Sequence, residues 1–201
     1  MNRANDIHSD ASRDDILRVV VPREQIARRV DELAEEIARC YRGRELSVLA
    51  VLTGSLVFLA DLIRRLPLRL RLQVMTASSY GADTEPGRLA VQIPLDVDLE
   101  GRDVLIVDDV LDTGHTLGEI IRRVSAQQPA SLRCCVLLDK ARPDIPSRPA
   151  ADFCGFRIDG QFVVGYGLDV DNLYRNLPDI CVLKESVLRD VLQAARGRDG
   201  M

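Results

Sequence analysis

The chain has 201 residues, of which 46% are hydrophobic and 29% charged, and its formal net charge is −4. This length fits one domain with room for a small appendage, and it can bury a core without disulfides or metals. The charge balance gives no support to a nucleic-acid or membrane partner. No apolar run could cross a bilayer, and the N-terminus has no secretory signal pattern, so we expect a cytoplasmic protein.

The cysteines agree with that expectation. The chain has five of them, an odd number without any CxxC pair, and several stand in apolar runs. They are Cys40, Cys134, Cys135, Cys154 and Cys181. Buried, reduced thiols of a cytoplasmic protein are the interpretation that fits this usage.

The N-terminal part reads as a tail, a strand and a helix. Residues 1–15 are polar and aperiodic, which is typical of a loose tail. Residues 16–21 are apolar enough for an edge strand, and Pro22 suits the first turn of a helix. Apolar residues then recur at helical spacing over 22–42, where the charged residues are expected to form a solvated face.

A strand–loop–helix unit follows. Residues 46–52 predict a buried strand that ends in Thr53-Gly54-Ser55, and apolar residues at helical spacing come next. Because this unit recurs later in the chain, we expect a parallel, doubly wound sheet. Ligands of such sheets bind where loops leave the carboxyl ends of the strands. By itself, Thr53-Gly54-Ser55 fits a simple turn as well as a ligand-binding loop.

The next stretch predicts a strand over 72–79 and a returning strand over 89–95. Between them, residues 80–90 are polar, contain glycine and lack periodicity. A loop of this length is typical of a lid or of a disordered segment.

The central stretch begins with the apolar run Val104–Val107, which predicts a buried strand closed by Asp108 and Asp109. Asp112-Thr113-Gly114-His115-Thr116 follows, and then an apolar pattern at helical spacing. Small hydroxyl residues and a glycine at a helix start favour anion binding. The acids can hold sugar hydroxyls, directly or through a divalent metal. The pattern therefore indicates a sugar phosphate, the alternative being an ordinary turn whose acids cap a helix.

The C-terminal part contains a strand over 132–138, a proline-containing linker over 143–151, a short strand over 152–158 and a final helix over 184–196. Several polar or aromatic residues stand out in it. Taken alone, Lys140 and Arg175 read as surface charges, Phe162 and Val163 as core residues, and Asp169 as a turn acid.

Two segments carry a family resemblance. Residues 104–117, VLIVDDVLDTGHTL, resemble the phosphoribosyl-pyrophosphate-binding motif of the type I phosphoribosyltransferases. Residues 152–183, DFCGFRIDGQFVVGYGLDVDNLYRNLPDICVL, resemble the C-terminal part of hypoxanthine–guanine phosphoribosyltransferases. The resemblance covers about residues 46–183. It implies a single α/β domain with a mainly parallel twisted sheet flanked by helices, a small purine-binding hood over about 143–180, and a homodimer or homotetramer.

The resemblance also implies a reaction. A 5-phosphoribosyl group would pass from phosphoribosyl pyrophosphate to hypoxanthine or guanine, giving IMP or GMP and pyrophosphate, with Mg²⁺ as cofactor. Asp112 would be the general base on the purine ring nitrogen. Asp108 and Asp109 would hold the ribose hydroxyls and the metal. The 5′-phosphate would be bound by Thr113, Gly114, His115 and Thr116.

Other roles follow from the same resemblance. Thr53 and Gly54 would bind pyrophosphate, and relatives often carry a cis bond at the position of Leu52–Thr53, where both isomers stay open from sequence. Ser79 and Tyr80 would begin a mobile loop over 80–90 that closes on the site. Lys140 would recognise the 6-oxo group of the purine.

In the hood, Phe162 would stack on the purine and Val163 would offer its backbone to the base edge. Asp169 would bind Mg²⁺, and Arg175 would neutralise the pyrophosphate. Three positions depart from the family pattern, because relatives commonly have Lys or Arg at His115, often Glu at Asp108, and in some cases Lys at Thr53. Each departure is a tuning change, although a histidine is less reliably charged at neutral pH.

Three rival functions have to be compared with this one. A phosphoribosyltransferase for xanthine or a pyrimidine stays open, although Lys140 argues against a pyrimidine. A nucleotide-sensing regulator that reuses the fold is a second reading, which the retained Asp112 disfavours. A Rossmann dehydrogenase is the weakest, since no GxGxxG follows any predicted strand.

Overall fold

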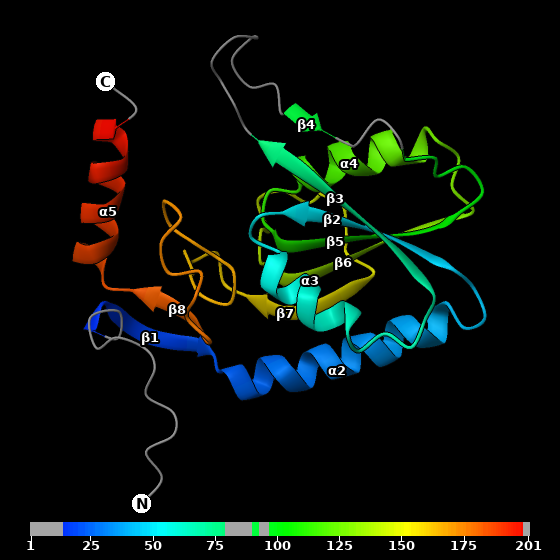
Figure 1. Ribbon diagram of the computed structural model, residues 1–201. Coiled ribbons are helices and arrows are strands. Elements are labelled where there is room, and N and C mark those ends of the chain that lie inside the picture. Colours follow the sequence, from blue (N-terminus) through cyan, green and yellow to red (C-terminus); the bar gives the residue numbers. More distant parts are fainter. Residues whose placement is uncertain (1–13, 79–89, 93–96, 199–201) are drawn as a thin grey trace, which may run out of the picture. The chain divides into compact units, whose positions relative to one another are not determined.

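The computed structural model describes residues 14–78, 90–92 and 97–198 (Figure 1). The chain divides into two compact units, and each is described by itself. One consists of residues 28–160, and the other combines residues 1–27 with 161–201. Within the described residues, no helix is long and apolar enough to cross a membrane.

The larger unit is built on a six-stranded sheet with the order β4-β3-β2-β5-β6-β7. Its strands are β2 (Leu46–Leu52), β3 (Leu70–Ser78), β4 (Ala90–Gln92), β5 (Asp103–Leu111), β6 (Ser131–Lys140) and β7 (Phe153–Ile158). Every neighbouring pair is parallel except β3 with the edge strand β4. The prediction of a mainly parallel sheet is confirmed. From β2 the chain builds outward on one side, and from β5 on the other, so a topological switch point lies between these two strands.

Helices cover both faces of this sheet (Figure 1). They are α2 (Arg23–Cys40), α3 (Leu56–Ile63) and α4 (His115–Ser125). On one face, α4 packs into a buried cluster that includes Leu49, Ile106, Ile120 and Val136. Alternate strand residues point to the other face, where α2 and α3 lie. Burial on both faces explains why β2, β5 and β6 read as near-continuous apolar runs.

The smaller unit pairs the two ends of the chain. Strand β1 (Ile16–Val21) runs antiparallel to β8 (Ile180–Leu183), and α5 (Glu185–Arg198) follows. A buried cluster joins these elements to the loop before β8; it contains Val164, Val170, Leu177, Cys181 and Leu183, with Ile16 and Leu188 packed against it. The Asp15 carbonyl accepts a hydrogen bond from the Lys184 backbone N–H at 2.9 Å. The strand over 16–21 and the final helix agree with the sequence prediction, whereas β8 was not predicted.

One predicted boundary is wrong. The sequence places Asp108 and Asp109 at the close of their strand, but β5 continues through both acids to Leu111. Pairing with β6 persists over this stretch, where Val110 lies opposite Leu138 and Leu111 opposite Asp139. The main-chain partners on β6 therefore extend the strand past the apolar run.

The prediction of unpaired cysteines is confirmed, since all five are free and buried or half-buried.

The charged residues of α2 are not all on a solvated face. The half-buried Arg29 donates hydrogen bonds to the backbone carbonyls of Gly155 at 3.1 Å and Cys154 at 2.8 Å. It also pairs with Glu32 and Glu36, each at 2.9 Å. The two carbonyls belong to β7, an edge strand of the sheet. A guanidinium is therefore expected to tie the helix to an otherwise open sheet edge.

Replacing this arginine tests the tie. We expect Arg29→Met to lower the free energy of unfolding by about 1–3 kcal/mol, because charge-assisted hydrogen bonds to β7 are lost. The measurement is chemical denaturation. Arg39→Met on the same helix is the control, since Arg39 is exposed and only 3.9 Å from the exposed Glu35, and it should change stability by less than about 0.5 kcal/mol. Equal effects of the two substitutions would contradict the tie.

Candidate active site

The switch point between β2 and β5 gathers the first set of candidate residues. The two strands pair in parallel, so the loop after β2 and the carboxyl end of β5 lie side by side. The loop is Thr53-Gly54-Ser55, and the Leu52–Thr53 peptide bond is cis. The carboxyl end of β5 contains Asp108 and Asp109.

Gly54 and Asp109 come into very close approach. A Cβ atom placed on Gly54 would lie 1.6 Å from Asp109 Oδ2 and 2.7 Å from Asp109 Cγ. No side chain can therefore stand at position 54 while Asp109 keeps this rotamer. The next residue, Ser55, holds the loop against β2, since its buried hydroxyl donates a hydrogen bond to the Val51 carbonyl. The turn and the acid are thus fitted to each other.

Asp108 is buried, with 6% of its surface exposed. Its Oδ1 accepts a hydrogen bond from the Asp109 backbone N–H at 2.9 Å. Burial raises the pKa of Asp108 well above its ordinary value, and the charge of Asp109 raises it further. Among the described residues no cationic side chain forms an ion pair with either acid. The pair is therefore suited to hydroxyl donors or to a cation that arrives with the ligand.

The start of α4 offers backbone donors next to these acids. The β5–α4 loop, residues 112–114, ends in Gly114, whose φ of 80° lies in the left-handed region. The Gly118 N–H donates to the Gly114 carbonyl at 2.8 Å. The N–H groups of residues 115–117 precede this bond and have no acceptor within the helix. Together with the helix dipole, they favour an anion at this end.

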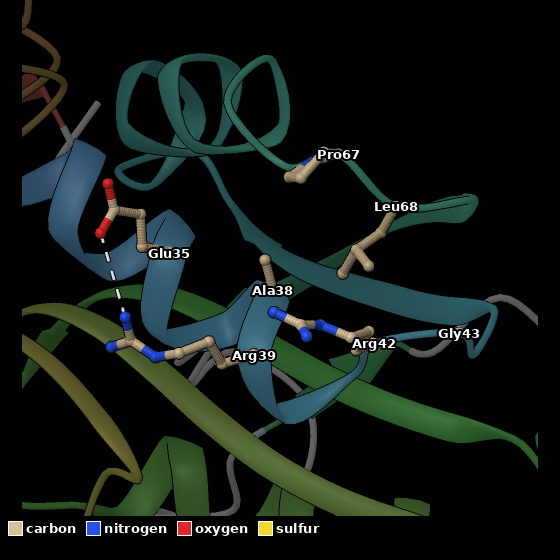
Figure 2. Close-up of a pocket in the computed structure, with 7 residues that line it drawn as sticks. All are labelled: Glu35, Ala38, Arg39, Arg42, Gly43, Pro67 and Leu68. Carbon is tan, nitrogen blue, oxygen red and sulfur yellow. Dashed lines mark ion pairs between the residues drawn. The ribbon is translucent and has the colours of Figure 1, made fainter.

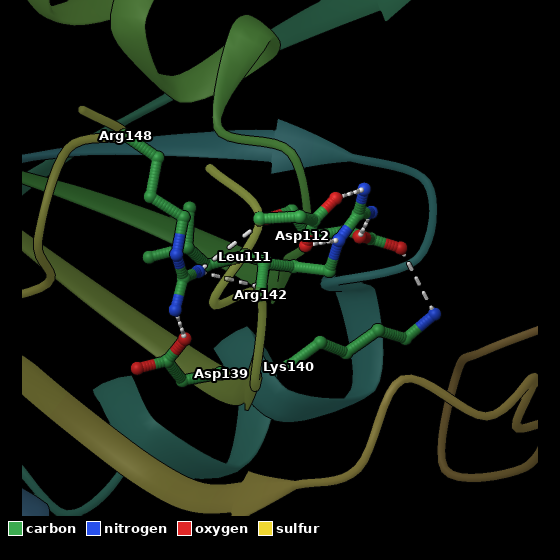
Figure 3. Close-up of polar contacts among 7 residues, drawn as sticks. Leu111, Asp112, Asp139, Lys140, Arg142 and Arg148 are labelled. Carbon is green, nitrogen blue, oxygen red and sulfur yellow. Dashed lines mark hydrogen bonds and ion pairs between the residues drawn. The ribbon is translucent and has the colours of Figure 1, made fainter. Parts of the chain in front are cut away.

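Asp112 lies between two cations (Figure 3). Its Oδ2 is 3.2 Å from Lys140 Nζ, and its Oδ1 is 2.6 Å from Arg142 Nη1. Arg142 also holds Asp144 at 2.8 Å. Partial burial by itself would raise the pKa of Asp112, but the hydrogen bonds from Arg142 and Lys140 outweigh it and the pKa is lowered. Asp112 is therefore an ionised acceptor at neutral pH.

Arg142 and Arg148 were not among the predicted residues. Arg148 Nη2 lies 2.5 Å from Asp139 Oδ1, and both side chains are largely buried. Arg148 Nη1 reaches the carbonyls of Leu111 at 3.3 Å and Asp112 at 3.4 Å. The only sequence signal for these arginines was their place in a loop directly after Lys140. Their partners at Leu111 and Asp112 are 30 or more residues away in the sequence, so spacing could not reveal these contacts.

The smaller unit holds the other candidates. Phe162 is 43% exposed, so it is a solvent-facing aromatic rather than a core residue, whereas Val163 is buried. Asp169 Oδ1 forms an ion pair with Arg175 Nη2 at 2.9 Å, and Asp169 Oδ2 accepts from the Asn172 N–H at 2.7 Å. This geometry joins two residues for which the resemblance implies neighbouring roles. The remaining candidates, Ser79 and Tyr80, lie outside the described residues.

Comparisons with known proteins assign the family. Residues 20–171 match the family model described as the phosphoribosyl transferase domain. The chain belongs to the phosphoribosyl transferase family. The type I fold and the sequence resemblance are thereby confirmed.

Its relatives include purine enzymes. A hypoxanthine-guanine-xanthine phosphoribosyltransferase of Tritrichomonas foetus is 38% identical over 87% of this chain and 95% of its own. A hypoxanthine-guanine phosphoribosyltransferase of Bacillus subtilis is 40% identical over 86% of this chain and 96% of its own. A hypoxanthine phosphoribosyltransferase structure from Staphylococcus aureus superposes with a TM-score of 0.81 and 36% identity, covering 89% of this chain and 97% of that one.

One cavity of this phosphoribosyltransferase lies away from the acids. It measures about 420 Å³ and is lined by Glu35, Ala38, Arg39, Arg42, Gly43, Pro67 and Leu68 (Figure 2). These residues stand before the first residues of β2 and β3, at the amino ends of the strands. Ligands of this architecture bind at the carboxyl ends, so this cavity is not the candidate active site.

The fit between Gly54 and Asp109 gives a direct test. We expect Gly54→Ala to rotate the Asp109 carboxylate away and to lower phosphoribosyl transfer about 100-fold, with the fold retained, since a small misplacement of a catalytic group can cost this much. Steady-state kinetics and circular dichroism measure the two effects. Gly118→Ala is the matched control, because a Cβ there meets nothing within 4 Å. Full activity of Gly54→Ala would show that the Asp109 rotamer is dispensable.

Proposed function

We propose that this chain transfers a 5-phosphoribosyl group from phosphoribosyl pyrophosphate to hypoxanthine or guanine, forming IMP or GMP and releasing pyrophosphate in purine salvage. The observation that carries the proposal is the contact between Lys140 Nζ and Asp112 Oδ2 at 3.2 Å. A 6-oxopurine presents its O6 and N7 atoms on one edge. An ammonium donor beside a carboxylate acceptor matches O6 next to a protonated N7. Adenine carries an amine donor at position 6 and fits this pair poorly.

The reaction breaks the bond between the anomeric carbon and the pyrophosphate oxygen and forms a bond to a purine ring nitrogen. By analogy with glycoside chemistry, the transition state has oxocarbenium character. Asp112 accepts the proton that leaves the purine ring. Thr113, Gly114, His115 and Thr116 bind the 5′-phosphate through backbone N–H and hydroxyl groups, supported by the free donors at the start of α4. Thr53 and Gly54 bind the pyrophosphate.

Mg²⁺ is part of the proposal. Mg²⁺ is usually held by one or two carboxylates together with substrate oxygens and waters, and the pair Asp108 and Asp109 fits this donor set. When bound, Mg²⁺ neutralises charge on the pyrophosphate. In the smaller unit, Asp169 is a further candidate Mg²⁺ ligand, and Arg175 is a candidate cation for binding pyrophosphate.

The remaining roles and the setting are proposed on chemical grounds. Phe162 is exposed and free to stack on a purine, and the Val163 backbone is offered to the base edge. Ser79 and Tyr80 would start the loop that covers the site. A cytoplasmic location is supported by the unpaired cysteines. A homodimer or homotetramer is supported by the exposed apolar side chains of Leu72 and Val74 on β3.

The decisive assay offers phosphoribosyl pyrophosphate and Mg²⁺ with hypoxanthine, guanine, xanthine or adenine separately. We expect turnover of hypoxanthine or guanine, little with adenine, and a loss in kcat of about 10²–10⁴-fold for Asp112→Asn. Asp190→Asn on the exposed face of α5 is the control and should match the wild type. Binding of phosphoribosyl pyrophosphate without turnover of any purine would instead favour a nucleotide-sensing regulator.

Arg142 sets the ionisation of the proposed base. Removing its charge in Arg142→Gln should raise the pKa of Asp112, since one of the two cations that lower it is lost. The acid limb of the pH profile of kcat/KM should then move to higher pH, because Asp112 must be deprotonated to accept a proton. Carbon-13 NMR of the carboxyl groups reports the same change directly. Arg122→Gln, which removes an exposed partner of Glu119, should leave both unchanged, and an unmoved acid limb in Arg142→Gln would contradict this role.

A further inference from the structure

Arg148 forms a clamp across the ends of two strands. Its guanidinium is 2.5 Å from Asp139 and reaches the carbonyls of Leu111 and Asp112 with a second nitrogen (Figure 3). Leu111 is the last residue of β5 and lies opposite Asp139 of β6 in register. Arg148 thus joins the last paired position of the two strands to the first residue of the β5–α4 loop.

The Pro149 ring and the Cβ atom of Arg148 pack on the other end of that loop. A Cβ atom on Gly114 would lie 2.7 Å from Pro149 Cδ and 3.0 Å from Arg148 Cβ. Residues 148 and 149 therefore stand against Gly114, at the point where its φ of 80° turns the chain into α4. The β5–α4 loop is held at its entry by the guanidinium and at its exit by packing.

The clamp depends on the geometry of an arginine. The guanidinium has its donors in a rigid, planar fork, so one edge can hold a carboxylate while another nitrogen faces carbonyls. The contacts to the Leu111 and Asp112 carbonyls are long and share one nitrogen, so they are weaker than the ion pair with Asp139. The ion pair therefore holds the guanidinium in place, and the two carbonyls orient it. A lysine ammonium could keep the pair with Asp139 but could not span both sets of acceptors.

We propose that Arg148 is a positioning residue that fixes the β5–α4 loop in the conformation that binds the phosphate of the ribosyl donor. This inference rests on the proposed function, which assigns that phosphate to the loop and the first turn of α4. Arg148 touches neither substrate in this account. It acts through the carbonyls of residues 111 and 112 and through Gly114, so the backbone N–H groups are oriented before the donor arrives.

The test separates donor binding from purine binding. For Arg148→Gln we expect the KM for phosphoribosyl pyrophosphate to rise about tenfold, while the KM for hypoxanthine changes less than about twofold and kcat falls less than about threefold. Isothermal titration calorimetry should show the same loss in affinity for phosphoribosyl pyrophosphate alone. Arg157→Gln is the matched control, because Arg157 faces the same Asp139 at 3.9 Å but is 87% exposed, and it should behave as the wild type.

Two further variants guard against a loss of folding. Arg148→Lys keeps the charge pair with Asp139, so its melting temperature should stay near that of the wild type while most of the KM defect remains. Asp139→Asn removes the anchor from the other side and should raise the same KM. A lower melting temperature with an unchanged KM in these variants would make Arg148 a structural residue only and would overturn the proposal.

The outcomes distinguish a failure of this inference from a failure of the proposed function on which it rests. Wild-type turnover combined with a wild-type KM in Arg148→Gln would overturn the role of Arg148 and leave the proposed function standing. Equal changes in both KM values would also overturn it, because they would indicate a general disturbance of the site. A wild-type protein that neither binds nor uses phosphoribosyl pyrophosphate would overturn both.

Discussion

The parallel pairing of β2 with β5 is the constraint on which the candidate active site depends. The register runs from Leu46 opposite Asp103 to Ala50 opposite Val107, so both strands deliver their following residues to the same edge of the sheet. There the turn after β2 meets the acids of β5, and Gly54 leaves the space that the Asp109 carboxylate fills. A slip in the register of β2 and β5 would separate the turn from the acids, because each residue has a fixed face of the sheet and a fixed position along the strand.

Two acids of this stretch have opposite environments. Asp108 is buried beside another carboxylate, and its pKa is raised. Asp112 is paired with Lys140 and Arg142, and its pKa is lowered. Environments that shift the pKa values of two carboxyl groups in opposite directions allow residues close in sequence to serve different purposes. Asp108 and Asp109 are suited to a cation that arrives with a ligand, whereas Asp112 is already paired with two cations of the protein.

The segment after β6 connects these features. Lys140 ends β6, Arg142 and Arg148 follow it, and all three side chains reach the end of β5 or the loop after it. Because Leu111 and Asp139 are opposite each other in the sheet, the two loops that leave these strands stand side by side. The arginines then neutralise acids and occupy carbonyls at an edge that would otherwise expose them. The same chemistry that stabilises this edge holds the proposed base and the anion-binding turn in place.

The sequence by itself determined the fold class, the buried strands, the helices between them and the family. Apolar runs and helical spacing are local patterns, and the motif over 104–117 keeps its residues adjacent in the chain. The tertiary structure decided the rest. It extended β5 through the acids, paired β1 with β8 and exposed Phe162. It also brought Arg29, Arg142 and the Nη1 atom of Arg148 to partners far along the chain. These contacts depend on strand order and on loop paths, which local spacing does not encode, so only the folded chain shows which charge meets which.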